Sequence, residues 1–88
     1  MPDASRLYHI SSAIITVQPA KAEGVATLVA SMPGVEVHAR EGSKIVITIE
    51  GATTGFLGDS LMQIALLDGV FAANMVFEHV DKLEGTEQ

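Results

Sequence analysis

The 88-residue sequence has no cysteine and no tryptophan, and its aromatic residues are limited to three Phe and one Tyr. The absence of cysteine excludes disulfides, thiolate zinc sites and cysteine nucleophiles. Basic residues are scarce as well, since five Lys and Arg against eleven Asp and Glu give a net charge of −6. Phosphate binding needs a concentrated basic surface, so this composition argues against nucleic acid and favours a cationic partner.

Long apolar runs are also lacking. No stretch of the sequence approaches the roughly 20 apolar residues that are needed to span a bilayer. The first six residues lack the basic start and following apolar segment that mark a signal peptide. We therefore expect a soluble, cytoplasmic protein that does not insert into membranes.

The sequence contains two similar halves. Met32-Pro33-Gly34-Val35 stands where a helical pattern ends and a strand pattern begins, and Leu67-Asp68-Gly69-Val70 stands at an equivalent point. The two glycines are 35 positions apart, and a shift of the same size places residues 10–15 on residues 45–50. Glycine accepts the left-handed conformation that closes a helix, so both motifs indicate a helix followed by a strand. Each half therefore predicts a strand–helix–strand unit.

The expected elements follow the order βαββαβ. The predicted strands are His9–Val17, Val35–Arg40, Lys44–Glu50 and Val70–Val80, and the predicted helices run from Pro19 to Met32 and from about Thr54 to Leu67. Right-handed crossovers place both helices on one face of a four-stranded antiparallel sheet, the ferredoxin-like α+β sandwich. We expect one domain over residues 1–80, followed by an acidic, disordered tail over 81–88.

The periodicity also predicts which residues face the core. The expected helical stripes are Val25, Leu28, Val29 and Met32 in the first helix and Leu57, Leu61 and Ile64 in the second. In the last strand we expect Val70, Ala73, Met75 and Phe77 inside, with a bulge after Val70, and Asn74, Val76 and Glu78 outside. The first strand carries apolar groups on both faces, so its core face stays open. An apolar sheet face without helices is typical of a partner surface.

Signals for catalysis are weak. Ser11 and Ser12 lie in a strand without the elbow motif of a serine nucleophile. The spacing of His9, His38 and His79 does not demand a shared metal site. We therefore expect no enzyme activity and no cofactor. An ACT-like regulatory or dimerisation domain that uses its open sheet face would fit these features, as would a binding protein.

Five segments together resemble the NapD family, over roughly residues 7–80. The segments are His9–Ile15, Met32–Val37, Lys44–Glu50, Gly69–Val70 and Met75–His79. The start, Ile-Ser-Ser before an apolar strand, is the most distinctive. The sequence departs from the family pattern in the opening of the second helix, Thr54–Gly58, and at Phe77 and Glu78. These departures concern partner contacts more than family membership.

The resemblance implies a function. Members of the family are cytoplasmic chaperones that bind the twin-arginine signal peptide of NapA, the catalytic subunit of the periplasmic nitrate reductase. They delay export through the Tat machinery until the cofactors are in place, and they carry no cofactor themselves. We expect the NapA precursor as partner and a monomer or weak dimer. Such a peptide offers two arginines and an apolar segment, which match acidic and apolar groups on an open sheet face.

The expected peptide contacts are spread over all four strands. Our hypothesis is that the peptide touches His9, Ser11 or Ser12, Thr48, Asn74 and Val76, and that Glu36, Glu50 or Glu78 faces its arginines. Arginine forms directional, bidentate pairs with carboxylates, so carboxylates on the outer faces of the strands are its expected partners.

Overall fold

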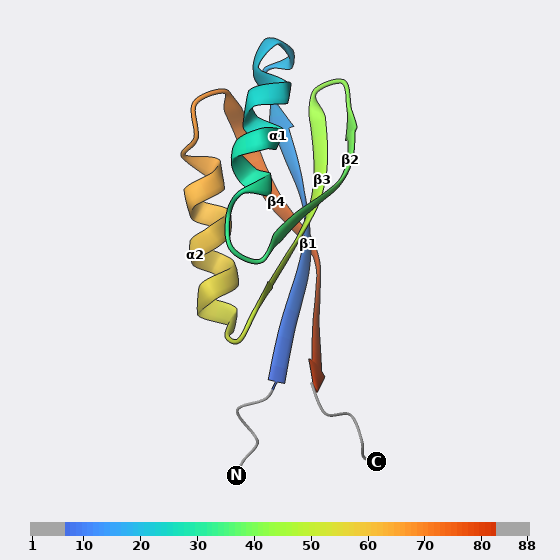
Figure 1. Ribbon diagram of the computed structural model, residues 1–88, viewed down its shortest axis with the longest axis vertical. Coiled ribbons are helices and arrows are strands. Elements are labelled where there is room, and N and C mark those ends of the chain that lie inside the picture. Colours follow the sequence, from blue (N-terminus) through green and yellow to red (C-terminus); the bar gives the residue numbers. More distant parts are fainter. Residues whose placement is uncertain (1–6, 83–88) are drawn as a thin grey trace.

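The computed structural model describes residues 7–82, and it describes the side chains of residues 9–79 (Figure 1). The elements are β1 (Leu7–Val17), a 3-10 turn η2 (Pro19–Lys21), α1 (Ala22–Ala30), β2 (Val35–Glu41), β3 (Lys44–Gly51), α2 (Thr54–Ala65) and β4 (Val70–Lys82). This confirms the predicted order βαββαβ. The strands form one antiparallel sheet in the order β2-β3-β1-β4, so β1 and β3 are central.

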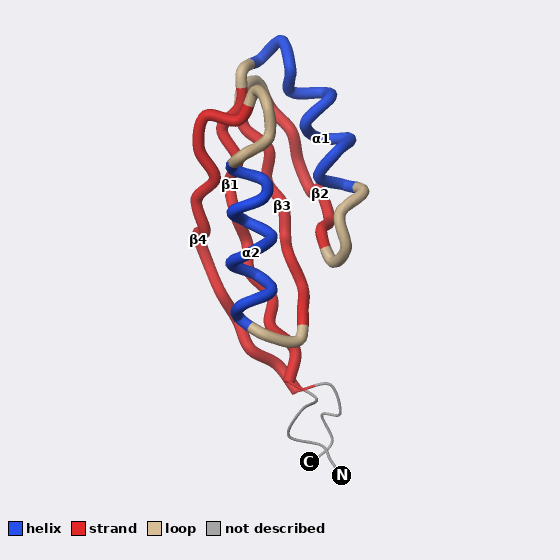
Figure 2. Tube along the Cα trace, turned by 90° about the vertical axis from the view of Figure 1, so that its left-hand side faces the viewer, coloured by secondary structure: helices blue, strands red, loops and turns tan. Residues whose placement is uncertain are grey.

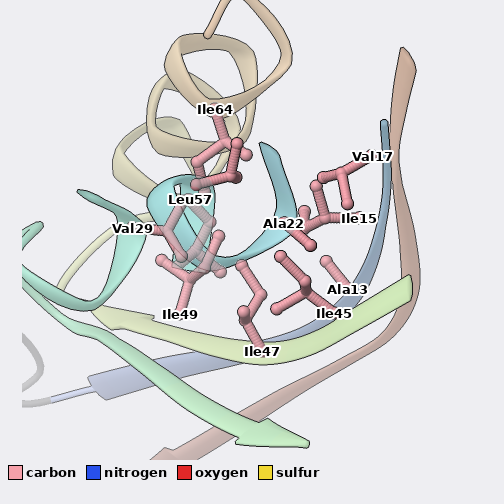
Figure 3. Packing of buried hydrophobic residues seen from close by; sticks show 11 residues of the cluster. Ala13, Ile15, Val17, Ala22, Val29, Ile45, Ile47, Ile49, Leu57 and Ile64 are labelled. Carbon is pink, nitrogen blue, oxygen red and sulfur yellow. The ribbon is translucent and has the colours of Figure 1, made fainter. Parts of the chain in front are cut away.

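Both helices cover the same face of the sheet, which confirms the ferredoxin-like arrangement (Figure 2). The core between the two layers contains eleven buried apolar residues (Figure 3). They are Ala13, Ile15 and Val17 of β1, Ile45, Ile47 and Ile49 of β3, Ala22, Val25 and Val29 of α1, and Leu57 and Ile64 of α2. Within residues 7–82, no segment covers the opposite face of the sheet, which we call the open face.

The strand register assigns the core face of β1, which the sequence left open. Alternate residues from Ser11 to Val17 are buried. Ser11, Ala13 and Ile15 pair with the buried isoleucines of β3. Ile10, Ser12, Ile14 and Thr16 therefore lie on the open face. Because β1 is central, its outer face remains partly apolar even though no helix covers it.

Local sequence signals explain where the helices begin and end. Pro19 opens the 3-10 turn at the position where a missing N–H costs nothing. Thr53 caps α2, since its side-chain oxygen accepts a hydrogen bond from the Phe56 N–H at 3.0 Å. Gly34 and Gly69 have φ values of 78° and 93°, which only glycine adopts readily. Both repeated motifs therefore close a helix as the sequence predicted.

Several predicted details were wrong. The first and last strands, β1 and β4, are longer than expected, since Leu7 pairs with Lys82 and Tyr8 with Asp81. The predicted end of the last strand at Val80 is therefore two residues too early. The rest of the predicted tail, 83–88, lies outside the described residues. Leu28 was predicted in the core but is 53% exposed, whereas Ala22 is buried.

Among residues 7–82, no helix is long and apolar enough to cross a membrane.

Candidate functional site

The open face is built of four rows of side chains, because residues directly paired across strands point to the same side. The rows, from the start of β1 towards its end, are Glu50–Ile10–His79, Glu36–Thr48–Ser12–Phe77, Ala39–Val46–Ile14–Asn74 and Glu41–Lys44–Thr16–Ala72. The rows begin towards the bottom of Figure 1, where β1 starts. Charged, aromatic and apolar groups are unevenly distributed along them.

Two carboxylates mark one end of this face, which we call the acidic end. Glu36 pairs with Thr48, and Glu50 is two residues further along β3 on the same side. Such diagonal neighbours have their Cα atoms about 7–8 Å apart. Gly34, directly before β2, lies opposite Glu50 and has no side chain to cover the Glu50 carboxylate. The two acids are therefore close enough to meet two successive cations of one ligand.

A histidine organises the polar groups beside these acids. His38 Nε2 and Thr48 Oγ1 form a hydrogen bond of 2.8 Å, and the same nitrogen lies 4.0 Å from Glu36 Oε1. The Glu36 side chain is 71% exposed, so its carboxylate remains available to solvent or to a ligand. This contact holds the hydroxyl of Thr48 next to the acidic end.

Aromatic rings occupy the opposite edge of the same rows. The rings of Phe77 and His79 stack with their centroids 6.2 Å apart and their planes 12° apart. Phe77 is 58% exposed and lies opposite Ser12, while His79 lies opposite Ile10. A cation that reaches the carboxylates of β2 and β3 would therefore approach across a face bordered by aromatic rings, which also attract cations.

The remaining two rows carry no net charge, and the first of them is mainly apolar. Ile14 and Val46 are paired neighbours in the centre, flanked by Ala39 and Asn74. The last row contains both Glu41 and Lys44, directly opposite each other, so its two charges balance. This half of the face can bury the apolar part of a ligand without a charge preference.

The structure brings together five of the predicted contact residues. Ser12, Glu36, Thr48, Glu50 and Asn74 all lie on the open face, within three adjacent rows. The arrangement joins polar groups from all four strands into one surface.

Two predicted contacts lie on the wrong side of the sheet. Ser11 is fully buried on the helix face, where it pairs with Ile49, and His9 has the same orientation along β1. Ser11 Oγ and His9 Nδ1 are buried and have no hydrogen-bond partner. Of the two serines that the hypothesis allowed, only Ser12 faces the open side.

The end of β4 was also predicted in the wrong orientation. β4 has a register shift opposite Ser12 and Ala13, with Val76 as the extra residue, in addition to the expected one near Val70. An extra residue exchanges the faces of everything beyond it. Glu78 consequently pairs with the buried Ser11 on the helix face, whereas Phe77 points to the open face instead of the core.

The predicted contacts left out four residues that the strand register places on the open face, namely Ile10, Ile14, Val46 and Phe77. Of these, Phe77 was hidden by the bulge, whereas the other three are apolar residues on strands that are buried on their opposite face. The sequence signal that could have found two of them is the pair Ile10 and Ile14, which lie on the same side of one strand. Among the described residues, no group of three or more His, Asp or Glu side chains is arranged to hold a metal ion.

The fold and its open face define a ferredoxin-like domain that presents one side of its sheet to a partner. The sequence model of the NapD protein family matches residues 8–82. The chain is 47% identical over 76 residues to a protein named chaperone NapD from Paracoccus pantotrophus, covering 86% of this chain and 68% of that relative. The chain belongs to the NapD family, as its sequence motifs predicted.

Two solved structures share the fold. The solution structure of the E. coli Tat proofreading chaperone protein NapD superposes with a TM-score of 0.76 at 18% identity, covering 92% of this chain and 86% of that one. A transcriptional regulatory protein of the AsnC family from Pyrococcus furiosus gives a TM-score of 0.60 at 12% identity, covering 91% of this chain and 53% of that one. At these identities the likeness concerns the fold alone.

Proposed function

We propose that this protein is a chaperone that binds the twin-arginine signal peptide of the periplasmic nitrate reductase precursor NapA. By holding the peptide, it delays export until the cofactors of the reductase have been inserted. Family membership supports this role, as do the names of the relatives, a chaperone and a Tat proofreading chaperone. The observation that carries the proposal is the open face, where two carboxylates adjoin an apolar surface.

The chemistry of the open face fits such a peptide. Two arginines would meet Glu36 and Glu50, with Thr48 and Ser12 as further hydrogen-bonding groups between them. The apolar segment of the peptide would cover Ile14 and Val46, whose partial exposure leaves apolar area to bury. Burial supplies affinity, while the arginine–carboxylate pairs supply specificity for a basic leader.

The proposed role also implies a cellular compartment, a mode of action and an oligomeric state. A signal peptide of this kind is accessible before export, so we propose that the chaperone works in the cytoplasm. It binds and releases its partner without a chemical step, which makes it a binding protein and not an enzyme. We propose that the active form is a monomer or weak dimer, since stable self-association through the open face would block the peptide.

Calorimetric titration with a synthetic twin-arginine peptide tests the proposal. We expect binding to the wild-type protein and weaker binding of a Lys-Lys peptide, because lysine cannot form the bidentate pairs of arginine. We expect Glu36→Gln and Glu50→Gln each to weaken binding by about two- to fivefold, and the double variant by about tenfold, the loss of about 1.4 kcal/mol.

Glu78→Gln is the matched control. The substitution removes the same charge from the same sheet, but Glu78 pairs with Ser11 on the helix face. We expect its affinity to equal that of the wild type. Loss of affinity in Glu78→Gln alone, with no change in the other two variants, would contradict the proposed site.

The alternative is an ACT-like regulatory or dimerisation domain that uses the same open face. The fold shared with a regulator of the AsnC family is compatible with this alternative, although it concerns architecture alone. Analytical ultracentrifugation beside the titration separates the two functions. A stable dimer that ignores both peptides supports the alternative, whereas a monomer that binds the Arg-Arg peptide supports the chaperone.

A further inference from the structure

The charge on the open face is distributed asymmetrically along the direction of β1. Glu36 and Glu50 lie in the first two rows, where no Lys or Arg of the described side chains shares the face. In the last row, Lys44 lies opposite Glu41 and balances it. A ligand with positive charge at one end therefore has different electrostatic energies in its two possible orientations.

The side chains across the sheet strengthen this asymmetry. The stacked rings of Phe77 and His79 accompany the acidic end, whereas the other end has Thr16 and Ala72 on the same side. Aromatic rings attract cations, and these rings lie two or three strands across the sheet from Glu50 and Glu36, so they add to the attraction of this end for positive charge. Unbalanced carboxylates and aromatic rings are therefore concentrated at one end, whereas the other end carries the balanced Glu41–Lys44 pair beside uncharged groups.

We propose that the signal peptide lies on the open face in one orientation, with its arginines at the acidic end and its chain running parallel to β1. The inference rests on the proposed function and adds the direction of the bound peptide. In a signal peptide the arginines precede the apolar segment, so the apolar segment crosses Ile14 and Val46 and ends near Thr16 and Lys44.

The dimensions of the face permit this arrangement. From Ile10 to Thr16, six residues of β1 extend about 20 Å. This length accommodates about 13 residues of a helix or about six residues of an extended chain. Either conformation places the arginines and the apolar segment over different rows, so the orientation does not depend on which one is bound.

Lys44 and Glu41 contribute to the choice of orientation. In the reverse orientation, the two arginines would lie beside the balanced Glu41–Lys44 pair, which offers them no net attraction, and Glu36 and Glu50 would face an apolar segment. In the proposed orientation the carboxylates are paired and the Glu41–Lys44 row remains balanced. A charge that is covered by apolar groups without a partner is costly, which disfavours the reverse orientation.

Spin-label distances test the direction. The natural chain has no cysteine, so Gln18→Cys and Ala52→Cys each give a single labelling site. Both residues are exposed, and they follow Val17 and Gly51 at opposite ends of the sheet. These ends are about 26 Å apart, from eight residues of β1. The full chain would be labelled and mixed with a peptide carrying a second label on the arginine side.

Pulsed dipolar spectroscopy should give a shorter distance from the peptide label to residue 52 than to residue 18, by about 10 Å or more. A label moved to the apolar end of the peptide should reverse the order. The opposite order, or equal distances to both sites, would overturn the orientation while leaving the proposed function intact. The absence of any dipolar signal would overturn both.

A charge variant gives a second, independent measurement. Glu36 and Glu41 belong to the same strand and both lie on the open face, but at opposite ends. We expect Glu36→Gln to weaken peptide binding by about two- to fivefold and Glu41→Gln to leave it within about twofold. Greater weakening in Glu41→Gln than in Glu36→Gln would overturn the orientation.

Discussion

The backbones of Gly34 and Glu50 are in direct contact at the end of the β2–β3 pairing, next to the Val35–Ile49 pair. The Glu50 N–H donates a hydrogen bond of 2.8 Å to the Gly34 carbonyl oxygen. A Cβ atom on residue 34 would lie 2.3 Å from the Glu50 carbonyl oxygen, and the φ of Gly34 is 78°. The glycine that closes α1 therefore also fixes the backbone that carries one of the two carboxylates of the acidic end.

We predict that Gly34→Ala destabilises the fold by about 2 kcal/mol or more. The left-handed conformation alone costs a residue with a Cβ about 1–2 kcal/mol, and the contact with a backbone oxygen adds to that cost. Urea unfolding measures the change in free energy. Because the substitution also displaces Glu50, we expect weaker binding of the Arg-Arg peptide even where the variant remains folded.

Gly58→Ala provides the matched control for this prediction. Gly58 lies inside α2, and a Cβ there would have no atom within 4 Å. Alanine in a helix interior is more stable than glycine by about 0.5–1 kcal/mol, so the same chemical change should now stabilise the protein. Equal effects of the two substitutions would contradict the roles assigned to these glycines.

Phe77→Ala should reduce binding more than stability. The Phe77 ring is 58% exposed on the open face. Removing a buried Phe side chain costs about 3–5 kcal/mol, whereas we expect less than about 1 kcal/mol here. We expect peptide affinity to fall by about fivefold, measured by calorimetry beside urea unfolding. A stability loss of about 3 kcal/mol or more would mean that Phe77 lies in the core after all.

The sequence predicted this fold well because its main signals are local and repeated. The two glycine-closed helices, the Pro19 start and the Thr53 cap each depend on a few neighbouring residues. The alternation of isoleucines in β3 likewise defines the core face of this strand without reference to any other part of the sequence. These signals were sufficient for the element order, the sheet and most of the core.

The orientation of the end of β4 could not be obtained in the same way. Met75, Val76 and Phe77 are all apolar, so no polar residue shows where the strand gains its extra residue. A shift by one residue exchanges the two faces, and it moved Phe77 onto the open face and Glu78 away from it. The predicted outward orientation of Glu36, Thr48 and Glu50 on β2 and β3 therefore agrees with the strand register, whereas the predicted orientation of the residues beyond the bulge in β4 does not.

Ser11→Ala tests the assignment of the first strand. The Ser11 hydroxyl is fully buried without a hydrogen-bond partner, so its removal relieves a desolvation cost instead of breaking a bond. We expect stability to be unchanged or to rise by about 1 kcal/mol, as measured by thermal unfolding, and peptide binding to be unchanged. A stability loss above about 1 kcal/mol would show that the hydroxyl is bonded in the folded protein.

Salt should weaken peptide binding, and the weakening should depend on Glu36 and Glu50. Exposed ion pairs contribute about 0.2–1 kcal/mol each and are screened as the Debye length falls from about 10 Å at 0.1 M to about 3 Å at 1 M. Titrations at increasing sodium chloride should therefore show a steep loss of affinity in the wild type and in Glu78→Gln. In the Glu36→Gln, Glu50→Gln double variant, the residual binding comes mainly from the apolar contacts of Ile14 and Val46, which salt does not screen. We expect its affinity to vary little with salt, and a slope equal to that of the wild type would mean that the arginines pair elsewhere.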